Sequence, residues 1–142
     1  MAQQAFHYEM PPEAKARPKT AVDVMRTELL SVGIQIVNGG GETNLHAHNG
    51  EDAVWLVLGG QAAFYNADGD RLLIGRHEMV VLPSGTKYWF ESASDEPLEI
   101  VRIGAKDPRV APSRTDVTSR DRVARVGATP HVQAEQIVAI PA

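Results

Sequence analysis

Short apolar runs separated by turn-forming residues are the feature of this sequence that most constrains its fold. Glycine, proline, asparagine and aspartate gather between the runs, where they favour tight turns. The runs show little helical periodicity, and several alternate apolar and polar residues as half-buried strands do. The succession predicts an all-β, antiparallel sandwich or barrel. The expected strands are residues 27–37, 45–48, 53–58, 61–66, 71–74, 79–82, 87–92 and 98–103.

These runs occupy only the middle of the chain, which predicts one domain with an arm at each end. The 142 residues, 43% of them hydrophobic, suffice for one ordinary core. Residues 1–21 are polar and are expected to form an N-terminal arm. Residues 22–105 are expected to form the barrel, and residues 106–142 a C-terminal arm or a lid over its mouth.

The charge and the residue types exclude several functions. A formal net charge of −4 offers no basic surface, so neither nucleic acid nor membrane is an expected partner. No stretch approaches the roughly 18 apolar residues of a membrane span, and the N-terminus lacks the pattern of a secretory signal. The absence of cysteine excludes disulfides and thiolate chemistry and is compatible with the predicted cytoplasmic location.

His46 and His48 are the strongest functional signal in the chain. Residues two apart in a strand project to the same face, so both imidazoles point the same way. The turn at Asn49-Gly50 then returns the chain and brings a carboxylate opposite the histidines. Two histidines and a carboxylate form a common divalent metal site, with iron, manganese, nickel, cobalt or zinc as the candidate cofactors.

Two neighbouring carboxylates compete for the third ligand position. Strand parity favours Asp52, because it shares a face with Val54, Leu56 and Leu58. Glu51 reaches inward instead if the turn is bulged. The non-ligand interpretation of Asp52 is a side chain that caps the turn.

The residues around the two histidines resemble the first conserved motif of the cupin superfamily. Gly40, His46, His48 and Gly59 fall in the register of that motif, and Asp52 occupies the position of its glutamate. The resemblance implies an antiparallel double-stranded β-helix, or jelly-roll, barrel. It also implies a metal bound by the motif's histidines.

A second stretch resembles the second cupin motif with departures. Gly75 and the turn Pro83-Ser84-Gly85 match it, but Tyr88 stands where the family usually has a histidine ligand. A neutral phenol is a poor ligand, since free tyrosine has a pKa near 10. Tyr88 is therefore expected either to coordinate the metal, to hydrogen-bond the substrate or to act as a catalytic acid or base. Simple packing in the core remains the alternative.

The same parity predicts a mainly apolar substrate pocket. Phe90 shares a face with Tyr88, and Phe64 is expected on the facing strand. Arg102 lies on the last predicted strand and would bind a substrate carboxylate if it faces the pocket.

Together these features predict a metal-dependent small-molecule enzyme of the mono-cupin type. Dioxygenase, isomerase, lyase and cyclase reactions all stay open. The alternative is a non-catalytic cupin that binds or senses a small ligand, with weak metal binding or none, which the replacement at Tyr88 favours. The family resemblance also predicts a homodimer.

Overall fold

The computed structural model describes residues 3–119 and 129–141, and almost all regular structure in it is β. One short 3-10 helix, η1 (Pro12–Ala16), precedes the barrel. Every other element is a strand. They are β1 (Gln3–His7), β2 (Lys19–Arg26), β3 (Leu30–Val37), β4 (His46–Asn49), β5 (Glu51–Gly59), β6 (Gln61–Tyr65), β7 (Arg71–Gly75), β8 (Met79–Leu82), β9 (Trp89–Ser92), β10 (Leu98–Lys106), β11 (Ser113–Asp116), β12 (His131–Gln133) and β13 (Glu135–Ile140).

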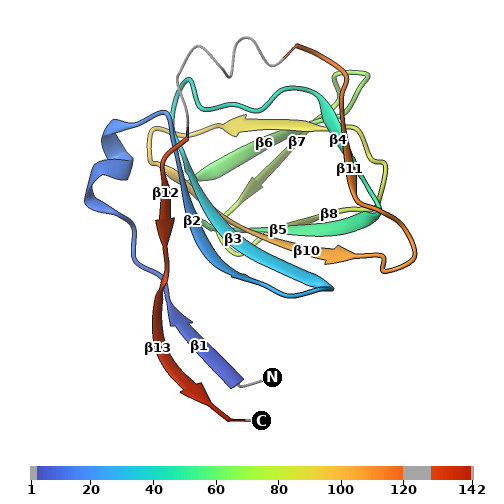
Figure 1. Ribbon diagram of the computed structural model, residues 1–142. Helices are drawn as coiled ribbons and strands as arrows, with labels where there is room; N and C mark the ends of the chain where they lie inside the picture. The colour runs from blue at the N-terminus through green and yellow to red at the C-terminus, as the bar shows by residue number, and fades with distance from the viewer. Residues whose placement is uncertain (1–2, 120–128, 142) are drawn as a thin grey trace.

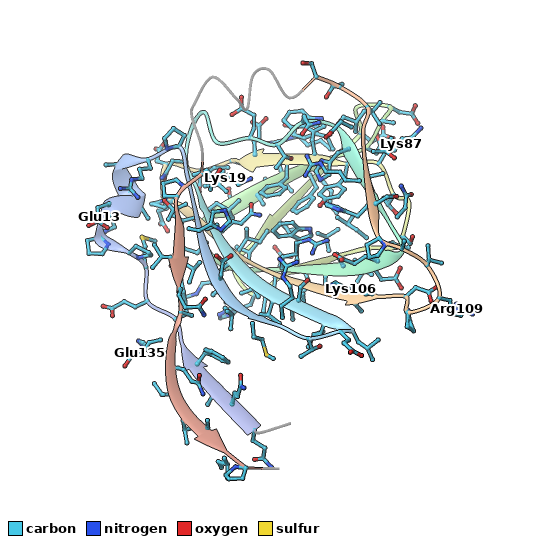
Figure 2. All side chains as sticks on the ribbon, viewed as in Figure 1. Glu13, Lys19, Lys87, Lys106, Arg109 and Glu135 are labelled. Atoms are coloured by element: carbon cyan, nitrogen blue, oxygen red, sulfur yellow. The ribbon has the colours of Figure 1, made fainter. Side chains whose placement is uncertain are left out.

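The strands form two facing layers (Figure 1). One layer is a six-stranded sheet in the order β12-β2-β3-β10-β5-β8. The other holds the three-stranded sheet β7-β6-β9 and the pair β11-β4, which an antiparallel bridge between His46 and Tyr88 joins. Side chains fill the space between the layers (Figure 2). The site described below lies where β4, β5, β9 and β10 border this space.

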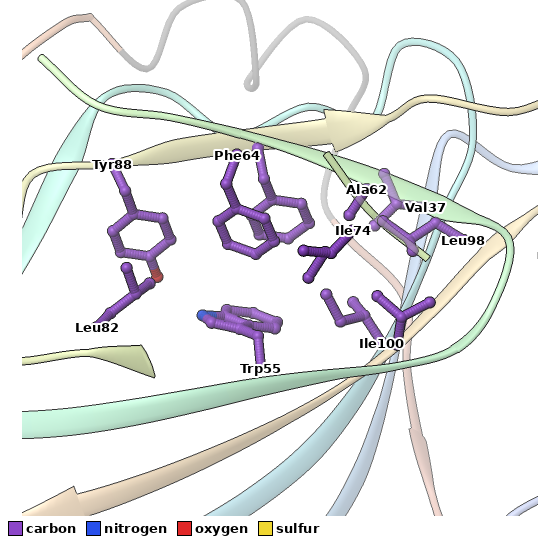
Figure 3. Close-up of a cluster of buried hydrophobic side chains, with 11 residues drawn as sticks. Val37, Trp55, Ala62, Phe64, Ile74, Leu82, Tyr88, Leu98 and Ile100 are labelled. Atoms are coloured by element: carbon purple, nitrogen blue, oxygen red, sulfur yellow. The ribbon is translucent and has the colours of Figure 1, made fainter. Parts of the chain in front are cut away.

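The core between the layers is aromatic. Trp55 of β5 faces Phe64 of β6 across this space (Figure 3). Val57 of β5 and Phe90 of β9 belong to the same buried cluster. The ring centroids of Trp55 and Phe90 are 4.9 Å apart, a favourable spacing for aromatic packing. The full cluster is Val37, Trp55, Val57, Ala62, Phe64, Ile74, Leu82, Tyr88, Phe90, Leu98 and Ile100.

A second apolar cluster lies on the outer face of the large sheet. Ile34 and Ile36 of β3 are buried there, because the N-terminal segment crosses the sheet and packs Phe6 and Met10 against them. Tyr8 of the same segment donates a hydrogen bond to Glu99 Oε1 at 2.7 Å. The predicted N-terminal arm therefore contributes to packing.

The chain ends contain strands that the sequence did not predict. β2 extends the large sheet by pairing with β3, and β12 pairs with β2 in parallel. β1 and β13 form a two-stranded ribbon that projects from the barrel (Figure 1). Of the predicted C-terminal arm, residues 120–128 and 142 lie outside the described residues. The described residues contain no helix long and apolar enough to cross a membrane.

Candidate functional site

His46 and His48 project from the same face of β4, as strand parity predicts. His46 is buried and His48 is half-buried. Their ring centroids are 5.0 Å apart with an edge-to-face arrangement. β11 holds β4 from the outside, with Arg114 paired with His48 and Asp116 paired with His46 along the backbone.

The tautomer of His46 follows from its main contact. His46 Nδ1 lies 2.6 Å from the carbonyl oxygen of Asn44. A carbonyl oxygen can only accept, so Nδ1 carries the hydrogen and Nε2 keeps its lone pair. Burial lowers the pKa of His46 to about 4, so the ring is neutral at neutral pH. Burial, together with the charge of Arg102, also lowers the pKa of His48.

Asn44 is a positioning residue that the sequence did not indicate. Its Oδ1 accepts a hydrogen bond from Arg114 Nη2 at 2.9 Å, and its Nδ2 donates to Asp116 Oδ1 at 2.9 Å. Nδ2 also donates to the backbone carbonyl of Thr118 at 3.0 Å. The Asn44 carbonyl orients His46, and these contacts attach the Asn44 backbone to the C-terminal arm. The charged strand β11 has no apolar alternation, so no sequence signal assigned it to this place.

Tyr88 lies directly beside the histidines. Its backbone N–H donates to the His46 carbonyl at 2.9 Å, and its carbonyl accepts from the His46 N–H at 3.0 Å. The Tyr88 ring centroid is 4.5 Å from that of His46 and 6.3 Å from that of His48. Burial raises the pKa of Tyr88, although the nearby charge of Arg102 opposes the rise. The phenol is therefore neutral at neutral pH.

The two candidate carboxylates point in opposite directions. Asp52 is exposed on the outer face, where its Oδ1 accepts a hydrogen bond from the backbone N–H of Ser84 at 2.7 Å. The expectation that Asp52 faces the histidines is wrong. Glu51 alternates with the buried residues Ala53 and Trp55 and so faces the interior. The bulged turn that the sequence suggested for an inward Glu51 is not required, because β5 begins at Glu51 directly after the turn and its regular alternation points Glu51 inward.

Glu51 forms an ion pair with Arg102 inside the barrel. The contact joins Glu51 Oε1 to Arg102 Nη2, and the side chains are 11% and 18% exposed. Arg102 also lies over the Trp55 ring, with its guanidinium carbon 5.8 Å from the ring centroid. Arg102 therefore faces the interior, which a carboxylate-binding role requires.

The predicted pocket residues lie in packed surroundings. Phe90 is fully buried, and Phe64 stacks on it with centroids 5.0 Å apart. Phe64 and Tyr88 also border a pocket of about 240 Å³ between the β6–β7 hairpin and β8. The aromatic lining therefore belongs mainly to the core.

Arg102 lines two separate spaces. A cavity of about 10 Å³ is bordered by His48, Glu51, Tyr88 and Arg102 among others. A larger groove of about 530 Å³ runs along β2 and β3, with Arg102 in its wall. The sequence did not indicate this groove, because its β2 wall was not predicted.

The described residues bring two of the predicted metal ligands together. The neutral tautomer of His46 and the neighbouring ring of His48 suit a divalent metal, which binds the unprotonated nitrogen of imidazole. Within residues 3–119 and 129–141, however, no three histidine, aspartate or glutamate side chains are grouped closely enough to hold a metal ion. The two imidazoles are thus available as ligands, and a third protein ligand would require a side-chain movement.

The sequence matches the cupin domain family over residues 33–104. The matched segment is about half of the chain and includes His46, His48, Glu51, Tyr88 and Arg102. No curated protein matched the sequence.

Solved structures with the same fold are numerous but distant in sequence. An RmlC-like cupin from Methanocaldococcus jannaschii has a TM-score of 0.63 at 15% identity, covering 77% of this chain and 95% of that chain. A double-stranded β-helix protein from Klebsiella pneumoniae has a TM-score of 0.57 at 17% identity, covering 65% and 79%. DMSP lyase DddQ from Ruegeria pomeroyi has a TM-score of 0.56 at 17% identity, covering 79% and 60%. The predicted antiparallel double-stranded β-helix barrel is confirmed.

Proposed function

The chain belongs to the cupin family, and from this premise we propose that it is a metal-dependent small-molecule enzyme of the mono-cupin type. A divalent metal binds His46 and His48. The observation that carries the proposal is the hydrogen bond from His46 Nδ1 to the Asn44 carbonyl at 2.6 Å. This contact fixes the tautomer in which Nε2 is free to bind a metal, as hydrogen bonds to metal-binding histidines commonly do.

His48 is the second ligand in this proposal. Its ring is adjacent to that of His46, with the centroids 5.0 Å apart. The lowered pKa of both rings supports the assignment, because only the neutral imidazole can coordinate a metal. Iron, manganese, nickel, cobalt and zinc all accept such ligands.

Glu51 is the third ligand that this proposal assigns. It borders the same cavity as His48 and Tyr88, whereas Asp52 lies on the outer face. The Glu51 carboxylate must leave Arg102 to reach a metal on the histidines. The completed set, two histidines and one carboxylate, is a familiar arrangement for a metal with open positions.

Each neighbouring side chain has a separate role. A bound metal would supply Lewis-acid chemistry toward an oxygen of the substrate. The Tyr88 hydroxyl holds its proton at neutral pH, so it donates a hydrogen bond or a proton to the substrate. The aromatic core beneath, with Trp55 and Phe90, excludes water from this part of the lumen. Oxygenase, isomerase, lyase and cyclase reactions are all compatible with these roles.

Metal titration of the purified protein tests the proposal. The protein is first stripped with a chelator, and Mn²⁺, Fe²⁺ under anaerobic conditions, Co²⁺, Ni²⁺ and Zn²⁺ are then added separately. We expect one equivalent of at least one metal to bind and to raise the unfolding temperature, since a ligand of the folded state stabilises it. His46→Ala and His48→Ala should abolish both effects. His7→Ala, at an exposed histidine of β1, is the matched control. Equal metal binding by the wild-type protein and His46→Ala would refute the metal site.

One observation favours a second candidate, a non-catalytic cupin that binds a small ligand. Glu51 is already paired with Arg102. Among the described residues, no three potential metal ligands lie close enough together to hold an ion. Such a protein would bind its ligand equally well with and without metal. Ligand binding that persists in the folded His46→Ala and His48→Ala variants would favour this candidate.

The homodimer stays a prediction, which exposed apolar side chains on the protein surface support. Met79 and Val81 of the edge strand β8 are 61% and 62% exposed, and Ile137 of the β1–β13 ribbon is 60% exposed. Exposed apolar residues on an edge strand are a common site of association. The molecular mass in solution, measured by light scattering, should correspond to two chains.

A further inference from the structure

The ion pair between Glu51 and Arg102 lies in an unusual place for a structural salt bridge. It is inside the barrel, bordering the small cavity that His48 and Tyr88 also line. Removing two charges from water is costly, and an apolar pair of similar size is often as stable. Its location next to the histidines therefore points to a use other than stability.

The backbone beside the pair is shaped to accommodate it. A Cβ atom at Gly104 would lie 2.5 Å from Glu51 Oε1 and 2.7 Å from Arg102 Nη1. Real Cβ atoms do not approach other atoms so closely. The missing side chain of Gly104 thus provides the space in which a carboxylate meets the guanidinium.

Arg102 holds Glu51 by a single contact, from Nη2 to Oε1. A planar guanidinium can hold a free carboxylate more fully, through two parallel hydrogen bonds. Glu51 is attached to the backbone of β5 and cannot adopt every orientation of a free ligand. A ligand carboxylate can therefore compete with it.

Other donors surround the same position. Trp55 Nε1 is buried beside the Tyr88 hydroxyl and opposes the rise that burial causes in the pKa of that phenol, although the two groups are not aligned as a regular hydrogen bond. Figure 3 shows this nitrogen on the side of the indole ring that faces the Tyr88 hydroxyl. A buried N–H with a poorly aligned partner is stabilised further when a better acceptor fills the site. Guanidinium, indole and phenol donors in one place suit an anionic oxygen ligand.

A route from outside also reaches Arg102. The groove of about 530 Å³ along β2 and β3 has Arg102 in its wall. Gln35, another residue of this groove, has a buried Oε1 without a hydrogen-bond partner among the described residues. The groove is large enough for a small organic molecule whose charged end contacts Arg102.

We propose that Arg102 binds the carboxylate of a small-molecule carboxylic acid, which displaces Glu51 and turns it toward His46 and His48. This inference deepens the proposed function by naming the substrate class, and its second half rests on the metal proposed there. Glu51 occupies the carboxylate position until the ligand arrives. Metal and carboxylate then bind cooperatively, and each raises the affinity for the other by the same factor.

Acetate binding to the metal-free protein tests the carboxylate position alone. The indole N–H resonance of Trp55 is followed by NMR and assigned with Trp89→Phe. We expect saturable shifts with acetate and none with acetamide, its neutral analogue. Glu51→Gln should bind acetate about tenfold more tightly, because Arg102 loses its resident partner. Glu96→Gln, at an exposed glutamate, is the matched control.

Removing the guanidinium gives the opposite result. Arg102→Gln should abolish the acetate-dependent shift, and Arg102→Lys, which keeps the charge but loses the planar fork, should weaken binding. Arg109→Gln, at an exposed arginine, is the control. Unchanged acetate binding in folded Arg102→Lys, or no gain in Glu51→Gln, would overturn the inference.

The coupling is tested with Co²⁺, whose visible spectrum reports its ligands. Co²⁺ should bind the wild-type protein more tightly when acetate is present. In Arg102→Gln, Co²⁺ should bind about tenfold more tightly without acetate, because Glu51 is no longer held away. Two results can be separated. If Glu51→Gln binds acetate more tightly but the wild-type protein binds no Co²⁺, Arg102 is the carboxylate position and the metal proposal is refuted. Co²⁺ binding through His46 with no effect of Arg102→Gln would refute the exchange and leave the metal proposal standing.

Discussion

His46 and Tyr88 are paired across the smaller layer by two backbone hydrogen bonds, of 3.0 and 2.9 Å, and by rings whose centroids are 4.5 Å apart. This isolated bridge joins the β11-β4 pair to the β7-β6-β9 sheet. The backbone therefore positions Tyr88 beside the histidines, and the phenol hydroxyl contributes nothing to the bridge itself. Removing the hydroxyl alone therefore tests the role of the Tyr88 side chain without breaking the backbone bridge.

Tyr88→Phe should leave metal affinity within about threefold of the wild-type value. Burial raises the pKa of Tyr88, and a neutral phenol is a poor metal ligand. The backbone bridge to His46 persists in the variant, so the histidines keep their arrangement. Metal titration measures the effect, with Tyr65→Phe on β6 as the control. A loss comparable to that of His46→Ala would instead identify Tyr88 as a ligand.

Asp52→Asn should reduce stability slightly and leave metal binding unchanged. The Asp52 carboxylate accepts the Ser84 N–H on the outer face, and weakening one such contact costs about 0.5–1.5 kcal/mol. Urea unfolding measures the stability, and Co²⁺ titration measures the affinity. Glu51→Gln is the matched comparison and should weaken metal binding. The reverse ranking of the two variants would restore Asp52 as the ligand.

The sequence predicted the barrel well because its turns and strands carry local signals. The predicted strand at residues 79–82 coincides with β8, and the parity of His46 and His48 follows from geometry alone. Parity favoured Asp52 over Glu51 and was wrong, because both faces of β5 are apolar and the outer face was taken for the inner one. Val54 and Leu56 cover its outer face as Ala53 and Trp55 cover its inner face.

The ends of the chain were harder to predict because their strands depend on distant partners. β11 contains Arg114 and Asp116 and lacks an apolar stripe, yet it pairs with β4 and holds Asn44. β2 is stabilised by pairing with β3 and by the N-terminal segment across its outer face. Such contacts between distant parts of the chain leave little trace in a local pattern.

Stability of the metal-free protein should fall as the pH is lowered from about 6.5 to about 4. Burial lowers the pKa of His46 to about 4, whereas an unfolded histidine titrates near 6.5. Between these values the unfolded chain binds a proton at His46 that the folded chain does not, so protonation favours unfolding. The full effect is on the order of 3 kcal/mol, and it is complete once the folded state also protonates.

The contribution of His46 is isolated by comparing variants at several pH values. The free energy of unfolding of the wild-type protein, minus that of His46→Gln, should decrease steadily as the pH is lowered through this range. His7→Gln removes an exposed histidine and should show no such trend. A difference that is independent of pH would mean that His46 titrates normally in the folded chain.

Gly104→Ala should open the Glu51–Arg102 ion pair while the barrel remains folded. The new Cβ would lie 2.5 Å from Glu51 Oε1, 2.7 Å from Arg102 Nη1 and 2.8 Å from Ser31 Oγ. All three are ends of side chains, so they can move aside and the strand can stay in place. We expect a loss of about 1–3 kcal/mol in urea unfolding, typical of overpacking.

The neighbouring strand offers a matched substitution, because a Cβ at Gly33 would meet only Val22 O at an ordinary 3.5 Å. Gly33→Ala should therefore be neutral or slightly stabilising. The new Cβ also fills the space in which a ligand carboxylate would meet Arg102, so Gly104→Ala should bind acetate more weakly than the wild-type protein, in contrast to Glu51→Gln. The contrary result is that Gly104→Ala and Gly33→Ala are equally stable and both bind acetate as the wild-type protein does. The side chains of Glu51 and Arg102 would then not share the space beside Gly104, and the position assigned to the ligand carboxylate would be wrong.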